Sequence, residues 1–186
     1  MSDLVPLVPR QAVPALRVDL AGGGQFDLAS EKPANFTLLV FYRGLHCPIC
    51  KMQLKDLESK LDEFEKRGVS VVALSTDDKE RAEQTLQTWG LSRLRIGYGV
   101  SLDAARHWGL YVSSGRGKTS AGVDEPALFS EPAIYLVKPD GTLYFGSVQT
   151  MPFARPHFSD ILTAIDFVVK NNYPARGEVA DLRKTA

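Results

Sequence analysis

The chain has 186 residues, and its 22 Lys and Arg residues balance 22 Asp and Glu residues, so the formal net charge is zero. This balance provides no overall field that would attract nucleic-acid phosphates or anionic lipid, so neither a nucleic acid nor a membrane is expected as a partner. No window approaches the roughly 18 consecutive apolar residues of a membrane span, and residues 1–10 do not have the pattern of a signal peptide. The length suffices for one domain over residues 1–186, with a core from about residue 16 to residue 170.

The N-terminal part of the chain predicts a small β-hairpin followed by a buried strand. Three consecutive glycines at 22–24 form a turn between residues 16–20 and 25–28, and we expect this hairpin as an extension of the main sheet. Residues 36–41 (FTLLVF) are a continuous apolar run, which is typical of a strand covered on both faces.

Helical and strand patterns then alternate. Leucine and phenylalanine recur at spacings of three and four residues after Cys50, which predicts a long helix that ends at Gly68. Residues 69–74 (VSVVAL) predict the next buried strand, and the polar segment 75–78 is typical of the start of a helix that reaches Trp89. The resulting βαβα order indicates an α/β protein.

The second half of the chain is less regular. Residues 94–100 predict a short strand and residues 101–108 a short helix. Residues 112–131 are rich in Gly, Ser and Pro and lack a hydrophobic period, so we expect a long loop that is either functional or a solvated connector.

The C-terminal part predicts an antiparallel hairpin and a last helix. The hairpin joins residues 133–137 and 142–148 through a Pro-Asp-Gly turn, and an amphipathic helix follows Pro156. We therefore expect a central mixed sheet flanked by helices.

The segment Cys47-Pro48-Ile49-Cys50 lies where the first buried strand gives way to the long helix. Pro48 suits the first helical position, where its missing N–H has no cost. The free amides and the positive end of the helix dipole then favour a thiolate at Cys47. Cys50 lies one turn further on the same face, where its thiol can attack a mixed disulfide at Cys47.

Three neighbouring residues are candidates for shaping this site. Arg43 and a protonated His46 would add positive potential, although His46 facing solvent is an equal alternative. Pro132 precedes the strand 133–137, and a cis bond before it would present a backbone edge beside the cysteines. An ordinary trans proline is the alternative.

Other readings of the chemistry are weaker. The two cysteines could be structural or half of a zinc site, but the chain has three histidines and neither a second CxxC nor an HxxxH, so no metal is expected. The Gly-Lys-Thr at 117–119 lacks the context of a phosphate loop, so no nucleotide or other cofactor is expected. Arg155 could hold an anion, but a structural role is favoured; Trp89 and Trp108 are expected in the core.

Residues 41–50 (FYRGLHCPIC) resemble the active-site segment of the peroxiredoxin-like branch of the alkyl hydroperoxide reductase C and thiol-specific antioxidant family. The resemblance extends over about residues 16–170 and implies a thioredoxin-like fold. It also implies that Cys47 is the attacking thiol and Cys50 the resolving thiol. Pro132 falls where thioredoxins have their cis-proline.

The sequence departs from typical peroxiredoxins at three places. Gly44 and Val40 stand where the family has Thr and Pro, and Pro132 stands where the family has its active-site Arg near the late strand. The sequence therefore favours a thiol-disulfide oxidoreductase that cycles between the Cys47–Cys50 dithiol and disulfide. A thiol-dependent peroxidase and a redox-sensing or binding module without turnover are the alternatives.

The partners follow from this chemistry. We expect an external thiol reductant such as the thioredoxin or glutathione system, and a protein disulfide or hydroperoxide as substrate. The low cysteine content favours a reducing, cytoplasmic location. The oligomeric state is left open.

Overall fold

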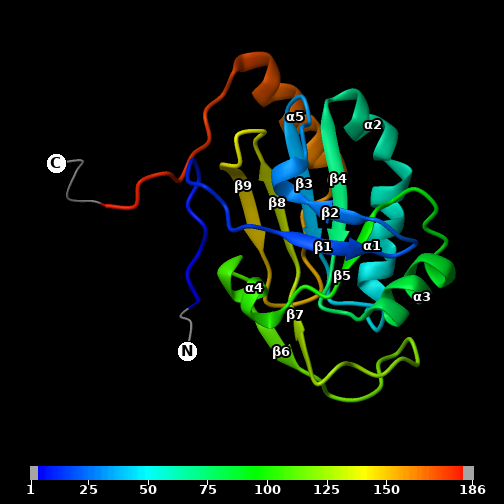
Figure 1. Cartoon of the computed structure of the whole chain (residues 1–186). Helices are drawn as coiled ribbons and strands as arrows, with labels where there is room; N and C mark the ends of the chain where they lie inside the picture. The colour runs from blue at the N-terminus through cyan, green and yellow to red at the C-terminus, as the bar shows by residue number, and fades with distance from the viewer. Residues whose placement is uncertain (1–3, 182–186) are drawn as a thin grey trace.

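The computed structural model describes residues 4–181 and has a seven-stranded sheet at its centre (Figure 1). The sheet is built around β3 (Phe36–Phe41), whose six residues are all buried. β3 pairs in parallel with β4 (Val69–Leu74) and antiparallel with β8 (Ala133–Val137). The strand order is β2-β1-β5-β4-β3-β8-β9, so the expected mixed sheet is confirmed.

Parallel crossovers connect β3, β4 and β5 (Ile96–Tyr98). The first crossover consists of α1 (Pro48–Ser59) and α2 (Leu61–Lys66), and the second contains α3 (Lys79–Trp89). The single helix expected up to Gly68 is therefore two helices, because Lys60 leaves the helical conformation with φ −110° and ψ 4°. The apolar spacing continues across this break, and only the backbone shows it.

The N-terminal hairpin is present as β1 (Arg17–Leu20) and β2 (Gln25–Asp27), followed by the short 3₁₀ helix η1 (Leu28–Ser30). It is an integral part of the main sheet, because β1 pairs antiparallel with β5. The hairpin therefore forms one edge of the sheet, in addition to preceding it in sequence.

The C-terminal hairpin forms the other edge. It consists of β8 and β9 (Leu143–Val148) and is followed by α5 (Phe158–Asn171), which buries Phe158, Ile161 and Ile165. α1, α2, α3 and α5 contribute to the core on one face of the sheet, whereas α4 (Leu102–His107) contributes to the core on the other. Trp89 and Trp108 are buried in these two cores, as expected.

The segment 112–131 is more ordered than its composition suggested. Its two ends pair as the strands β6 (Val112–Ser114) and β7 (Leu128–Ser130), which form a separate two-stranded sheet. In Figure 1 this pair lies at the lower end of the molecule, and the loop between the strands extends from it. The expectation of a loop over the whole segment is therefore wrong at both ends.

Helices cover both faces of the mixed sheet, so the α/β architecture expected from the sequence is confirmed. Within residues 4–181, no helix is long and apolar enough to cross a membrane.

Candidate active site

The backbone between β3 and α1 places Cys47 at the N-cap of the helix. Cys47 has extended backbone angles, and Pro48 occupies the first turn. The Cys47 sulfur accepts a hydrogen bond from the Cys50 backbone N–H at 3.2 Å. The sequence prediction of a cysteine facing free amides at the positive end of a helix therefore agrees with the structure.

Both cysteines are reduced and buried, with 2% of Cys47 and none of Cys50 exposed. A hydrogen bond from the Cys50 thiol lowers the pKa of Cys47 to about 6, and the Cys50 N–H and Arg155 add to this effect against the opposing effect of burial. Burial and the adjacent Cys47 raise the pKa of Cys50 well above its ordinary value. The pair is thus arranged as a thiolate at Cys47 and a thiol at Cys50.

Arg155 contributes the cation of this site, from the loop between β9 and α5. Its Nη2 lies 3.2 Å from the Cys50 sulfur and 3.9 Å from the Cys47 sulfur. Its Nη1 donates to the side chain of Gln53 on α1, which orients the guanidinium. Ala154, directly before it, has a φ of 58° and turns the chain toward the cysteines.

The sequence favoured a structural role for Arg155 and gave the binding of an anion as the alternative. The structure favours the alternative, since the guanidinium contacts both sulfurs, but the sequence did not connect Arg155 to the cysteines. The only sequence signal was a cation in an irregular segment far along the chain from the cysteines. No local spacing rule connects that segment to the CxxC, because the contact depends on how β9 and α5 fold back onto α1.

Arg43 lies next to the cysteine pair within a cluster of acidic side chains. It is 3.4 Å from Glu131 and 3.6 Å from Glu125, and its guanidinium covers the Phe129 ring at 4.6 Å. Arg43 also contributes to the lowered pKa of Cys47, as the smallest of the causes. Its expected positive potential is therefore present but is partly offset by two carboxylates.

His46 does not supply the positive charge that the sequence suggested. The side chain is fully buried and packs against Phe129 with 4.6 Å between ring centroids. Burial, assisted by Arg43, lowers the pKa of His46 to about 4, so the imidazole is neutral at pH 7. Both expectations, a protonated imidazole and an imidazole facing solvent, are wrong because the ring is buried against Phe129 and its Nδ1 lies 3.4 Å from the Arg81 guanidinium.

Asp77 fixes the loop that precedes Cys47. Its buried carboxylate accepts the Leu45 N–H at 2.7 Å and the Arg81 Nε–H at 2.9 Å. Gly44 lies directly against it with φ +133°, and a Cβ at Gly44 would come within 2.6 Å of an Asp77 oxygen. Gly44, which stands where the resembled family has Thr, therefore has no room for a Cβ in this loop.

Pro132 differs from the expected arrangement. No peptide bond among residues 4–181 is cis, so the predicted cis bond between Glu131 and Pro132 is wrong. The two residues form an extended connection from β7 to β8, in which Glu131 N–H binds Tyr111 O and Pro132 O accepts Gln149 N–H. A trans bond is the lower-energy form for such an extended segment.

A cavity of about 290 Å³ opens beside Arg155. Its lining includes Ile49, Met52 and Gln53 from α1 and Phe153 from the loop after β9. Met52 and Phe153 are 70% and 55% exposed, so the entrance has an apolar rim. The cavity provides an approach to the guanidinium that contacts the two sulfurs.

Within the described part of the chain, no group of three or more His, Cys, Asp or Glu side chains is arranged to hold a metal ion. The chemistry available at the site is that of the two thiols and the adjacent arginine.

Comparison with solved structures defines the fold class. The chain superimposes on peroxidoxin BcpB from Mycobacterium tuberculosis with a TM-score of 0.68 and 15% identity, covering 87% of this chain and 98% of that one. AhpC of Mycobacterium tuberculosis gives 0.70 and 12%, with 89% and 99% covered. Peroxiredoxin 6 of Arenicola marina gives 0.69 and 21%, with 94% and 81% covered. The fold is thus the thioredoxin-like fold of the peroxiredoxins.

The family follows from the sequence. The model of the AhpC/TSA family matches residues 9–145, which is more than half of the chain. No relative was found among the curated proteins. The chain belongs to the AhpC/TSA family and is an antioxidant oxidoreductase of the peroxiredoxin type.

Proposed function

We propose that the protein reduces hydroperoxides through a cycle in which Cys47 is the attacking thiolate and Cys50 the resolving thiol. The observation that carries this proposal is the contact of Arg155 with both sulfurs at the N-terminus of α1. An arginine within hydrogen-bond distance stabilises a thiolate and can also bind the oxygen atoms of a peroxide.

In the first step, the Cys47 thiolate attacks one oxygen of the hydroperoxide. An S–O bond forms, the O–O bond breaks, and the departing alkoxide takes a proton to leave as an alcohol, or as water from hydrogen peroxide. Cys47 becomes a sulfenic acid and the peroxide is reduced by two electrons. Arg155 is placed to stabilise the negative charge that moves onto the departing oxygen.

In the second step, the Cys50 thiol attacks the sulfur of the Cys47 sulfenic acid. The S–S bond forms, the S–O bond breaks, and the hydroxyl group leaves as water with the proton of Cys50. The raised pKa of Cys50 keeps this proton in place until the sulfenic acid has formed. An external dithiol then reduces the disulfide by exchange and is itself oxidised.

Burial favours a small substrate over a protein disulfide. Only 2% of Cys47 is exposed, so a disulfide on a folded protein cannot contact its sulfur directly. The sequence favoured dithiol exchange over peroxide reduction because the active-site arginine of the family was not found near the late strand. Arg155 supplies a cation at the two sulfurs. The ranking of the two activities is therefore the reverse of the one expected from the sequence.

We further propose a dithiol donor of the thioredoxin type, with the glutathione system as the alternative. A CxxC disulfide is reduced most directly by a second dithiol, since the mixed disulfide can then close on the donor. Because both sulfurs are buried in the reduced form, the loop before α1 has to open in the oxidised form to admit a protein donor, whereas a hydroperoxide does not need this opening. A reducing, cytoplasmic location would keep the cycle supplied with such a donor, and we retain it as part of the proposal.

Parallel turnover assays test the proposal. Wild type, Cys47→Ser, Cys50→Ser and Arg155→Gln are assayed with hydrogen peroxide and cumene hydroperoxide, using a thioredoxin system as donor. Insulin disulfides are assayed separately with dithiothreitol as donor, and the rate without the protein is subtracted, because thioredoxin would reduce insulin itself. We expect hydroperoxide turnover in wild type and none in Cys47→Ser. Arg155→Gln should lose about 100-fold in kcat/KM, the order of magnitude for loss of one charge-stabilising donor.

Two controls define the outcome. Arg17→Gln removes an exposed arginine of β1 and should retain wild-type turnover. Cys50→Ser should complete one turnover and stop as a sulfenic acid that dimedone labels. Faster turnover of insulin than of either hydroperoxide would instead assign the protein to disulfide exchange.

A further inference from the structure

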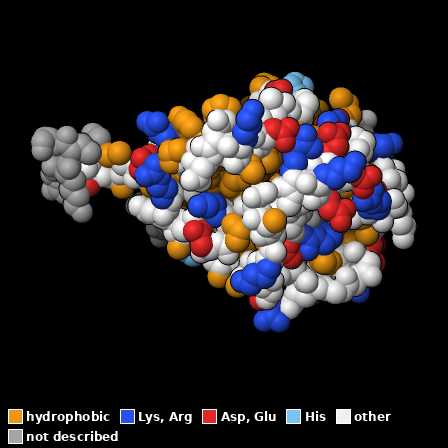
Figure 2. Space-filling model, turned by 90° about the horizontal axis from the view of Figure 1, so that it is seen from above, with side chains coloured by type: hydrophobic (Ala, Val, Ile, Leu, Met, Phe, Trp, Pro, Cys, Tyr) orange, Lys and Arg blue, Asp and Glu red, His pale blue; other side chains and the backbone are white. Residues whose placement is uncertain are grey.

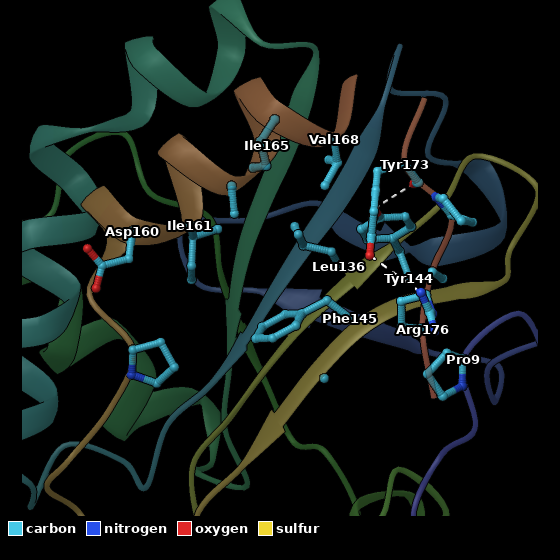
Figure 3. Close-up of a pocket in the computed structure, with 15 residues that line it drawn as sticks. Pro9, Leu136, Tyr144, Phe145, Asp160, Ile161, Ile165, Val168, Tyr173 and Arg176 are labelled. Carbon is cyan, nitrogen blue, oxygen red and sulfur yellow. Dashed lines mark hydrogen bonds between the residues drawn. The ribbon is translucent and has the colours of Figure 1, made fainter. Parts of the chain in front are cut away.

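A second cavity, of about 460 Å³, lies between α5, the β8–β9 hairpin and the C-terminal segment, which is defined here as residues 172–176 (Figure 3). Ile161, Ile165 and Val168 point from α5 toward the strands, where Leu136 and Tyr144 face them. The lining is almost entirely apolar. The volume falls within the range of roughly 300–1,000 Å³ that is typical of small-molecule sites. We refer to this cavity as the α5 groove.

The C-terminal segment forms the outer wall of the α5 groove and is held in place by hydrogen bonds. Asn172 ends α5 in the left-handed conformation with φ 45°, which turns the chain back over β9. The Tyr144 hydroxyl donates to Tyr173 O at 2.8 Å. Arg10 donates to Ala175 O at 2.9 Å and so ties the N-terminal segment to this wall. The cavity is therefore enclosed by α5, by the β8–β9 hairpin and by the C-terminal segment, which hydrogen bonds hold to Tyr144 and Arg10.

Apolar side chains remain accessible around the α5 groove. Phe145 is 36% and Tyr173 41% exposed, and both line the groove. Figure 2, which views the molecule from the end where α5 lies in Figure 1, shows hydrophobic side chains gathered on this face. An exposed apolar concavity of this kind is the usual mark of a binding site.

The two charged residues in the lining give the two ends of the α5 groove opposite charges. Arg176 lies at one end, near Tyr144 and Pro9, and Asp160 lies at the other end, near the start of α5 (Figure 3). A ligand with an anionic head is attracted to the Arg176 end and repelled by Asp160, and its apolar tail can lie along the side chains between them. A ligand of the opposite polarity would have to reverse its orientation.

We propose that the α5 groove binds a monocarboxylate with an unbranched hydrocarbon chain, with the carboxylate at Arg176. Neither cysteine lines the groove, nor does Arg155. Pro156 lines both the groove and the cavity beside Arg155, so the two sites are neighbours that share one wall residue. Binding in the α5 groove is independent of the proposed peroxidase cycle.

The test is titration of the reduced full-length protein with 11-(dansylamino)undecanoic acid, a fluorescent fatty acid, followed by displacement with laurate or with dodecanol. We expect a saturable increase in fluorescence with one site per chain. Laurate should displace the probe at a concentration at least fivefold lower than dodecanol, because only laurate has a charge for Arg176.

Two variants and two controls locate the site. Ala164→Trp places a large side chain in the α5 groove and should weaken probe binding at least tenfold, whereas Thr163→Trp, at the adjacent exposed position that does not line the groove, should remain within twofold of wild type. Arg176→Gln should weaken laurate at least fivefold and leave dodecanol unchanged. Cys47→Ser should bind the probe like wild type.

Any of three results overturns the proposal. These are the absence of a saturable signal in wild type, equal losses in Ala164→Trp and Thr163→Trp, and equal potency of laurate and dodecanol. Arg176→Gln changes an exposed side chain, so its result stands even if Ala164→Trp proves unstable in a thermal unfolding control.

Discussion

Cys47 and Cys50 are one helical turn apart, and their surroundings shift their acidities in opposite directions. The Cys47 sulfur receives hydrogen bonds from the thiol and backbone of Cys50, whereas Cys50 is more deeply buried and next to a thiolate. The difference is a property of local hydrogen bonding and burial, which the sequence spacing alone does not specify.

The pH dependence of alkylation tests this difference. Because the pKa of Cys47 is lowered to about 6, its thiolate is fully formed above pH 7 and falls to about a tenth at pH 5. We expect the iodoacetamide rate at Cys47 to rise roughly tenfold over this interval, with little labelling of Cys50. Peptide mapping by mass spectrometry distinguishes the two sites. Preferential labelling of Cys50 would reverse their assigned roles.

Gly44 shows why one position in the active-site loop is restricted to glycine. Gly44→Ala places a Cβ within 2.6 Å of Asp77 at a φ of +133°. We expect a loss of about 3 kcal/mol in the free energy of unfolding, combining backbone strain with overpacking. Urea denaturation measures it.

A matched variant separates the two causes. Gly117 also has a positive φ, of +93°, but nothing lies within 4 Å of its Cβ position. Gly117→Ala should therefore cost only the backbone strain. Equal losses at the two positions would show that the contact with Asp77 contributes nothing.

At the scale of elements, the β6–β7 hairpin acts as a cover for the active-site loop. Its connecting residues 115–127 are attached at three points: Thr119 donates to His46 O at 2.8 Å, Arg81 donates to Asp124 O at 3.2 Å, and Glu125 pairs with Arg43. These contacts join a segment without hydrophobic periodicity to α3 and to the residues that precede Cys47.

Removing one attachment should loosen this cover. Glu125→Gln abolishes the ion pair with Arg43, and we expect amide hydrogen exchange in residues 115–127 to increase about fivefold, equal to about 1 kcal/mol. Hydrogen-exchange mass spectrometry measures the change. Glu83→Gln breaks an exposed pair with Lys79 on α3 and should leave exchange in the hairpin unchanged.

At the scale of the whole molecule, the buried His46 connects acid pH to global stability. Its folded pKa of about 4 is below the ordinary value, so the unfolded chain binds a proton that the folded chain does not. The stabilising contribution of the neutral His46 is therefore fully present above about pH 6.5, and it is lost progressively as the pH falls toward 4. The contribution of His46 should be a loss of about 2 kcal/mol between pH 7 and pH 5.

The variant His46→Phe removes the titrating group while keeping a ring in the core. Urea unfolding at the two pH values should show a pH-dependent loss smaller by this amount than in wild type. His107→Gln changes an exposed histidine and should retain the wild-type loss. An unchanged pH dependence in His46→Phe would place the acid sensitivity elsewhere.

Oxidation should leave the molecule a single chain. Cys50 is the only other cysteine, and its closeness to Cys47 gives it a far higher local concentration than a partner chain provides. After one equivalent of hydrogen peroxide, we expect an intact mass lower by two hydrogen atoms and a monomer on a nonreducing gel. A disulfide-linked dimer through Cys47 would contradict the resolving role of Cys50.

The sequence by itself determined the order of elements and the position of the reactive pair. The apolar runs of β3 and β4, the helical spacing after Cys50 and the proline at position 48 are local signals, and each specifies a nearby conformation. These local signals were enough to predict a cysteine at a helix N-terminus, and hence to predict redox chemistry.

Only the tertiary structure decided which residues surround that pair. Arg155 reaches the sulfurs, and burial keeps His46 neutral, through contacts between segments distant in sequence. Gly44 is required by Asp77, which lies on another loop. Such contacts follow from how strands and helices pack around both faces of the sheet, and the acidity and exposure of a side chain depend on that packing rather than on its neighbours along the chain.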